Sequence, residues 1–168
     1  MDNPISKLDS LLKQIFRKKD SFSQYPFNRV LVPVSGFEID QEAITLAMEI
    51  TKPEGVIFAV YVSQIPLDMP LSDLSQGEVT QGELTLNRIK SAALKDKKVV
   101  ETEMLQARAV GPALLLEAEE RNVDLIIMGT QYTKHHGVFS LGEIVPYVLE
   151  NSLKPVWILR GSREGIIG

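Results

Sequence analysis

The chain contains no cysteine. This absence excludes disulfide bonds, thiolate nucleophiles and thiolate metal ligands, because each of these needs a cysteine sulfur. It also agrees with a reducing compartment, and we expect a cytoplasmic protein. The two histidines, His135 and His136, stand together in a polar stretch, and no acidic residue is spaced to join them around a metal ion. We therefore expect no metal site.

Positive charge is also scarce. The chain of 168 residues has 18 lysines and arginines against 22 aspartates and glutamates, which gives a formal net charge of −4. Binding to a nucleic-acid backbone needs clustered positive charge, so we expect no nucleic acid among the partners. No apolar run approaches the ~20 residues of a membrane-spanning helix, and the first residues have no apolar core of signal-peptide type.

Short β-branched runs alternate with segments of helical spacing, which predicts a single α/β domain. Most of the runs are apolar on both faces, as expected for a parallel sheet with helices on both sides. Right-handed crossovers then give a doubly wound sheet. We predict strands at Arg29–Val34, Val56–Val62, Val99–Leu105, Asp124–Gly129 and Pro155–Arg160, and helices at Asp40–Thr51, Gly82–Lys97, Pro112–Asn122 and Gly142–Ser152.

Several residues support these boundaries. Asp40 can cap the first helix, Pro112 suits a first turn, and Asn122 is a good stop signal. The stretch Ser63–Gln81 contains prolines, a glycine and no sustained period. We predict a long connection there, and the sequence leaves open whether it is a functional lid or a disordered segment.

Residues 1–28 stand apart as an amphipathic helix and linker, with apolar residues at helical spacing followed by a basic end. We favour packing of this extra N-terminal helix on the domain or on a second subunit. The alternative is a peripheral membrane or transporter contact through residues 4–19. Residues 162–168 form a short C-terminal tail.

In an open parallel sheet, ligands bind at the carboxyl ends of the strands, near the point where the strand order reverses. Three segments should meet there: the turn after the first strand at Ser35, the end of the second strand at Val62, and the loop from Gly129 to Gly142. The two glycines can present backbone N–H groups to a phosphate, or they can simply allow tight turns. Their spacing leaves both interpretations open.

The chain from Asn28 to Arg160 resembles the universal stress protein family. The family's first strand and turn run V-P-V-D-G-S, its third helix opens with G-P, its fourth strand reads D-L-I-V-M-G, and its end reads V-L…P-V-x-x-x-R. The matching residues here are Val32–Phe37, Gly111-Pro112, Asp124–Gly129, Val148-Leu149 and Pro155–Arg160.

The resemblance implies an adenine nucleotide alpha hydrolase-like fold over residues 29–161, with five strands in the order 3-2-1-4-5. It also implies a homodimer paired through the last strand, at Val156, Trp157 and Ile158. An apolar last strand left unpaired would be prone to aggregation, which agrees with such a pairing.

Nucleotide-binding members carry G-x-x-G, nine residues, then G-S or G-T. The corresponding residues here are Gly129, Tyr132, Gly142 and Glu143. Tyr132 places a ring where a glycine backbone would approach the phosphates, and Glu143 places a carboxylate at a helix N-terminus, where it would itself satisfy the free N–H groups. Ser35 stands where the family has an aspartate near the adenine and ribose.

The resemblance therefore implies a degenerate nucleotide site. Its residues are Pro33, Val34, Ser35, Val62, Met128, Gly129, Thr130, Tyr132, Gly142, Glu143 and Ile144.

We expect no enzymatic activity. The turn from Ser35 to Glu38 lacks the second glycine of an ATP-pyrophosphatase loop, and Gly137–Gly142 is one residue off a G-x-S-x-G nucleophile elbow. Our preferred interpretation is a non-catalytic regulatory domain that acts through dimerisation and an unknown protein partner. One alternative is a stress-response switch that binds ATP or AMP, with Mg²⁺ as a candidate cofactor. Another is a cytoplasmic regulatory domain that docks to a membrane transporter.

Overall fold

The fold is described from a computed structural model of the chain. The structure describes residues 27–70, 76–95, 98–131, 133–135 and 138–161. The predicted N-terminal helix, the contact proposed for residues 4–19 and the C-terminal tail lie outside these residues. No helix in the described part is long and apolar enough to cross a membrane.

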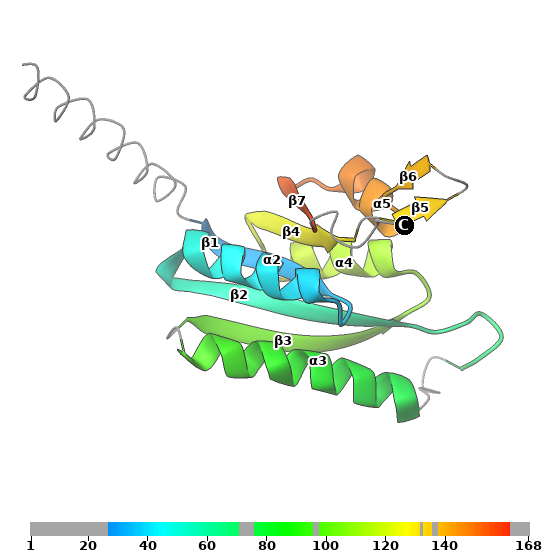
Figure 1. Ribbon diagram of the computed structural model, residues 1–168, viewed down its shortest axis with the longest axis horizontal. Helices are drawn as coiled ribbons and strands as arrows, with labels where there is room; N and C mark the ends of the chain where they lie inside the picture. Colours follow the sequence, from blue (N-terminus) through cyan, green and yellow to red (C-terminus); the bar gives the residue numbers. More distant parts are fainter. Residues whose placement is uncertain (1–26, 71–75, 96–97, 132, 136–137, 162–168) are drawn as a thin grey trace, which may run out of the picture.

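Five parallel strands form the main sheet, in the order β3-β2-β1-β4-β7 (Figure 1). The predicted order 3-2-1-4-5 is confirmed, with β7 as the fifth strand of the sheet. The two remaining strands form a separate antiparallel hairpin. The bounds are β1 Phe27–Val34, β2 Thr51–Gln64, β3 Val99–Ala107, β4 Leu125–Thr130, β5 Thr133–His135, β6 Val138–Ser140 and β7 Val156–Arg160.

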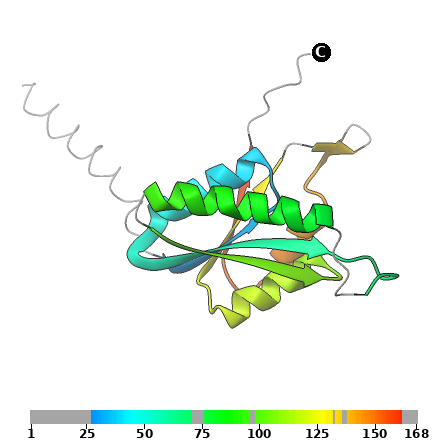
Figure 2. The ribbon, with the colours of Figure 1, turned by 90° about the horizontal axis from the view of Figure 1, so that it is seen from below.

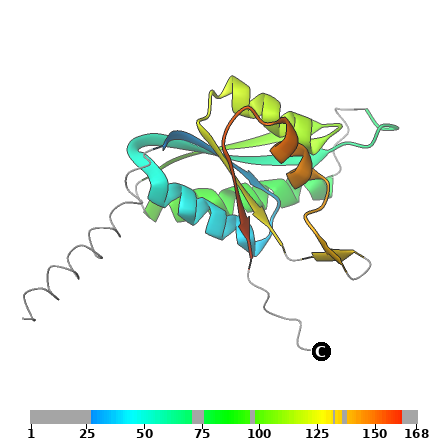
Figure 3. The ribbon, with the colours of Figure 1, turned by 90° about the horizontal axis from the view of Figure 1, so that it is seen from above.

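Helices cover both faces of the sheet, as predicted. Figures 2 and 3 show α2 and α3 on one side and α4 and α5 on the other. The bounds are α2 Glu38–Ile50, α3 Gln76–Lys95, α4 Val110–Glu120 and α5 Ile144–Asn151.

Side chains alternate between the two faces of β1 and divide the core into two layers. Val30 and Val32 pack with residues of α2 and α3, whereas Leu31 packs with residues of α4 and α5. All three side chains have an exposed fraction of 0%. A strand buried on both faces reads as a continuous apolar run, which is why its sequence pattern was clear.

The helix α2 begins at Glu38, two residues before the predicted start, and its N-cap residue is Phe37. Asp40 caps this terminus as predicted, but from the third helical position, where its carboxylate accepts the N–H group of Phe37 at 3.1 Å. The prediction for Asn122 is confirmed, because the chain leaves α4 there with a positive φ of 48°.

The predicted connection Ser63–Gln81 is too long. Strand β2 continues to Gln64, and α3 already begins at Gln76. The first turns of α3 present Gly77, Thr80 and Gln81 to solvent, so no apolar period marks them as helical in the sequence.

Candidate functional site

A pocket of about 390 Å³ opens at the carboxyl ends of β1, β2 and β4, beside the first turns of α4 and α5. This is the edge at which open parallel sheets bind ligands, and the strand order reverses between β1 and β4. The volume falls in the range of small-molecule sites. The pocket therefore lies where the sequence placed the site.

The structure brings the predicted site residues together around this pocket. Tyr132 lies outside the described residues, and all the others line the pocket: Pro33, Val34, Ser35, Val62, Met128, Gly129, Thr130, Gly142, Glu143 and Ile144. Their role in binding a nucleotide stays a prediction.

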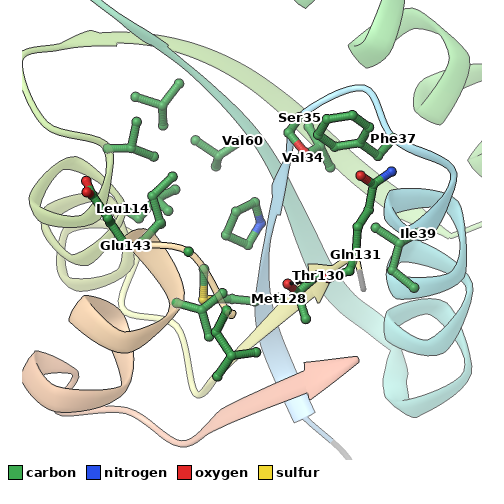
Figure 4. A pocket seen from close by; sticks show the side chains of 18 of the residues that line it. Val34, Ser35, Phe37, Ile39, Val60, Leu114, Met128, Thr130, Gln131 and Glu143 are labelled. Carbon is green, nitrogen blue, oxygen red and sulfur yellow. Dashed lines mark hydrogen bonds between the residues drawn. The ribbon is translucent and has the colours of Figure 1, made fainter. Parts of the chain in front are cut away.

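Other lining residues were missed by the sequence analysis. Phe37, Ile39 and Gln131 stand at one end of the pocket, while Leu114 and Leu141 add apolar surface elsewhere (Figure 4). Phe37 and Gln131 follow predicted strand ends by a few residues, so their position along the chain could have identified them as residues that line the pocket. Leu114 comes from α4, and nothing in the sequence pattern separates it from other core positions.

The turn between β1 and α2 is built around the carboxylate of Asp40. Its Oδ2 atom accepts three consecutive backbone N–H groups, from Ser35 at 2.8 Å, Gly36 at 2.7 Å and Phe37 at 3.1 Å. Gly36 has a φ of 95°, which a residue with a side chain rarely adopts. Successive N–H groups of this kind form an anion-binding concavity, and the chain fills it with its own carboxylate.

Burial raises the pKa of the Asp40 carboxyl above its usual value of 3.8, and the backbone N–H groups of Ser35, Gly36 and Phe37 oppose that shift. The side chain is only 4% exposed. Because removing a charged carboxyl group from water is costly, the three hydrogen bonds are needed to hold it there.

The two glycines of the loop after β4 serve different structural purposes. A Cβ atom on Gly129 would lie 3.1 Å from side-chain atoms of Ile39, so this glycine lets β4 approach α2 closely. Gly142 has a φ of 72° and open space around it, which makes it a turn glycine. The Gly142 N–H group donates to Ser140 Oγ at 3.1 Å. Each glycine thus has a structural reason for its place.

The N-terminus of α5 lies at the opposite end of the pocket from Phe37 and Gln131 (Figure 4). Glu143 is the N-cap residue, but its side chain makes no capping hydrogen bond. Our expectation that Glu143 satisfies the free N–H groups is therefore wrong. Its backbone has φ −101° and ψ −32°, whereas a capping side chain needs an extended backbone.

Pro146, the third residue of α5, has no N–H group and so removes one of the donors that a helix N-terminus normally offers. The sequence analysis did not take account of this proline, although its position near the predicted start of the helix was evident. Among the described residues that line the pocket, Glu143 has the one charged side chain, and it is solvent-exposed. The end of the pocket near α5 is therefore acidic and has one backbone donor fewer than an ordinary helix N-terminus.

Strand β7 lies at an edge of the main sheet, where it pairs with β4. Val156, Trp157 and Ile158, the residues expected to form the dimer interface, are half-buried. The Trp157 ring packs edge-on against Phe27, with the ring centroids 5.6 Å apart. The Trp157 indole therefore packs within the domain. A second subunit would pair with the backbone groups at the edge of β7.

No group of three or more His, Cys, Asp or Glu residues that could hold a metal ion occurs within the part of the chain that the structure describes. The two histidines of the sequence belong to the hairpin region after β4, where His136 lies outside that part.

Relatives of known structure share this architecture. A universal stress protein of Archaeoglobus fulgidus, solved with dAMP, superposes with a TM-score of 0.63 at 16% identity, covering 77% of this chain and 95% of that one. One from Arabidopsis thaliana, solved with AMP, has a TM-score of 0.60 at 14% identity, covering 81% and 93%. Another universal stress protein was solved with cAMP.

At the level of sequence, a universal stress protein of Methanocaldococcus jannaschii is 24% identical over 161 residues, which cover 92% of each chain. The model of the universal stress protein family matches residues 26–160. This match takes in every strand and helix described above, together with the pocket. The chain belongs to the universal stress protein family.

Proposed function

We propose that the protein is a non-catalytic regulatory universal stress protein that acts through a homodimer and a protein partner, and that its pocket does not hold nucleotide phosphates. The observation that carries this proposal is the state of the α5 end of the pocket. Glu143 supplies a negative charge there, Pro146 lacks an N–H group, and the N–H group of Gly142 is taken by Ser140.

The electrostatic effect of Glu143 is large enough to matter. A second negative charge about 4 Å away would be repelled by about 1 kcal/mol in water and by about 4 kcal/mol at an effective dielectric constant near 20. Glu143 is solvent-exposed, so the repulsion lies between these limits. Each 1.4 kcal/mol changes a dissociation constant tenfold. A triphosphate also finds one helix N-terminal donor fewer to offset this cost, because Pro146 has no N–H group.

The partner part of the proposal rests on β7. Within the part of the chain that the structure describes, no strand pairs with its outer edge, and its side chains are mostly apolar. Such an edge invites pairing with another strand. A two-fold axis beside β7 would pair two copies antiparallel and extend the sheet across both subunits. We place the protein in the cytoplasm because it contains no cysteine.

A nucleotide-binding switch is the second candidate, and two observations favour it. The pocket is open, with a volume of about 390 Å³ at the edge where open parallel sheets bind ligands. Solved relatives were determined with AMP, dAMP and cAMP. In this case ATP or AMP would bind despite Glu143, with Mg²⁺ screening the phosphate charge.

Calorimetric titration of the wild-type protein with ATP and with AMP, each with and without Mg²⁺, separates the two candidates. The proposal predicts no saturable heat up to millimolar nucleotide. A dissociation constant in the micromolar range for ATP would overturn it and support the switch.

A further inference from the structure

The interior of the pocket remains suited to a ligand even though its α5 end is acidic. Pro33, Val34, Val60, Leu114 and Met128 line it with apolar surface. The space that these side chains border has a volume of about 390 Å³. Burial of apolar ligand surface there favours binding. The pocket thus has the means to bind a small ligand.

The polar groups of the pocket are uncharged, apart from Glu143. Ser35 contributes a hydroxyl group and Gln131 an amide. The hydroxyl groups of Thr130 and Thr133 donate to the carbonyl groups of Gln131 and Ser140, so they offer a ligand their acceptor lone pairs. Figure 4 shows the Gln131 amide directed toward Phe37. Hydroxyl and amide groups both donate and accept hydrogen bonds, so they match the ring nitrogens, exocyclic groups and sugar hydroxyls of a neutral ligand.

Phe37 offers an aromatic face at the same end. Its side chain is 52% exposed, which is high for a phenylalanine in a turn that borders a pocket. Its backbone is fixed, because the Phe37 N–H group donates to Asp40. Aromatic side chains of this kind are platforms on which planar bases stack.

Several backbone donors around the pocket are already in use. Asp40 accepts the N–H groups of Ser35, Gly36 and Phe37, and Ser140 accepts that of Gly142. A phosphate group would have to break these hydrogen bonds to use the same donors, and near α5 it would also meet the charge of Glu143. An uncharged ligand meets no such repulsion.

We propose that the pocket takes an uncharged ligand of the nucleoside class in preference to its phosphorylated forms, with the planar base stacked on Phe37. This inference rests on the proposed function, because it needs the acidic α5 end to disfavour phosphate. It reverses the order of affinity that a phosphate-binding loop would produce.

The test is calorimetric titration of the full-length protein with adenosine, guanosine, AMP and ATP in the same buffer. We expect at least one nucleoside to bind, with a dissociation constant at least tenfold lower than those of AMP and ATP. Failure of both nucleosides to bind at millimolar concentration overturns the inference, and so does tighter binding of either nucleotide.

Two variants test the residues involved. Phe37→Ala should raise the dissociation constant of the bound nucleoside at least fivefold, whereas Leu84→Ala, an equally exposed apolar residue outside the pocket lining, should leave it unchanged. Glu143→Gln should lower the dissociation constant of AMP severalfold and so narrow the difference in affinity between the nucleoside and AMP. Unchanged nucleoside affinity in a folded Phe37→Ala protein, checked by its melting temperature, contradicts the stacking role.

The outcomes also separate this inference from the proposed function. If neither nucleosides nor nucleotides bind, the inference fails and the proposed function stands. If ATP binds in the micromolar range and more tightly than both nucleosides, both fail. If ATP binds in the micromolar range and a nucleoside binds at least tenfold more tightly, the proposed function fails and the preference for the nucleoside stands.

Discussion

Asp40 shows how one side chain can fix the turn that borders the pocket. Its carboxylate gathers three N–H groups from the residues that lead into α2, and two of these residues, Ser35 and Phe37, line the pocket. The sequence identified Asp40 as a polar residue at a helix start. It could not show that the carboxylate reaches back over five residues, because that depends on the positive φ of Gly36.

Replacing Asp40 tests this role. Asp40→Ala leaves three backbone donors without an acceptor, and we expect a loss of about 2 to 3 kcal/mol in the free energy of unfolding. Asp40→Asn keeps an acceptor oxygen and should cost about 1 kcal/mol. Urea denaturation of the three proteins measures both values. Equal losses for the two variants would contradict the account of this turn.

The pKa shift of Asp40 predicts a pH dependence with a definite sign. Because burial raises its pKa in the folded state above the usual 3.8, the folded protein binds this proton more tightly than the unfolded chain. The stability that Asp40 contributes is therefore fully present below the unfolded pKa and is lost as the pH rises through the folded pKa. The difference in the free energy of unfolding between wild type and Asp40→Asn should therefore decrease as the pH rises from the unfolded pKa to the folded pKa of Asp40. Denaturation experiments at several pH values measure this difference. If it increases with pH, the pKa of Asp40 is lowered on folding, which contradicts the account.

At the scale of elements, α4 and α5 meet through Gly111. A Cβ atom built on this glycine would lie 2.5 Å from Cδ1 of Tyr147, so the two helices have no room for one. The position of these helices matters for the site, because residues from the first turns of both line the pocket.

Gly111→Ala should therefore lower the free energy of unfolding by about 1 to 3 kcal/mol, through displacement of Tyr147 or of α5. Gly77→Ala in α3 is the matched control, since nothing lies within 4 Å of its Cβ position. We expect no loss there and a gain of up to about 1 kcal/mol, because alanine favours the helix. Thermal unfolding of both variants is the measurement, and equal destabilisation would argue against the close contact at Gly111.

The strands of the main sheet and the helices that cover it were predictable from the sequence, but the hairpin of β5 and β6 was not. Buried strands such as Leu125–Thr130 have continuous apolar runs, which few other structures produce. By contrast, β5 and β6 have three residues each, too few for any period to appear. Figure 3 shows this hairpin standing away from the sheet, so it has little apolar surface to bury.

For the whole molecule, the open edge of β7 is the feature with the clearest consequence. The Gly161 N–H group donates to Thr130 of β4 at 3.0 Å, and donors alternate along a parallel strand. The N–H group of Ile158 therefore points away from β4 toward the open edge. A second β7 strand would use it.

Ile158→Pro should convert the proposed homodimer into a monomer, because proline removes this outward N–H group while leaving the bonds to β4 in place. Ile158→Ala trims the side chain but keeps the donor and should remain dimeric. Light scattering after size-exclusion chromatography at micromolar concentration gives the masses. A monomeric wild-type protein would refute pairing through β7, and circular dichroism confirms that the proline variant folds.

The position of the site was predictable from the sequence, while its chemistry was only partly so. Strand ends such as Pro33–Ser35 and Met128–Thr130 converge because parallel strands share one edge. The presence of a carboxylate at Glu143 was also evident from the sequence. That this carboxylate makes no capping hydrogen bond could not be predicted, because this depends on the backbone angles of Glu143. The use of the Gly142 N–H group by Ser140 likewise depends on how the hairpin leads into α5.

The most direct test of the central claim is whether phosphate binding can be restored at the α5 end of the pocket. ATP should be titrated calorimetrically, with and without Mg²⁺, into wild type and into the Tyr132→Gly/Glu143→Ser double variant. We predict no binding by wild type and micromolar binding by the double variant, because the change removes the ring and the carboxylate. Equal binding of ATP by both proteins would contradict the account.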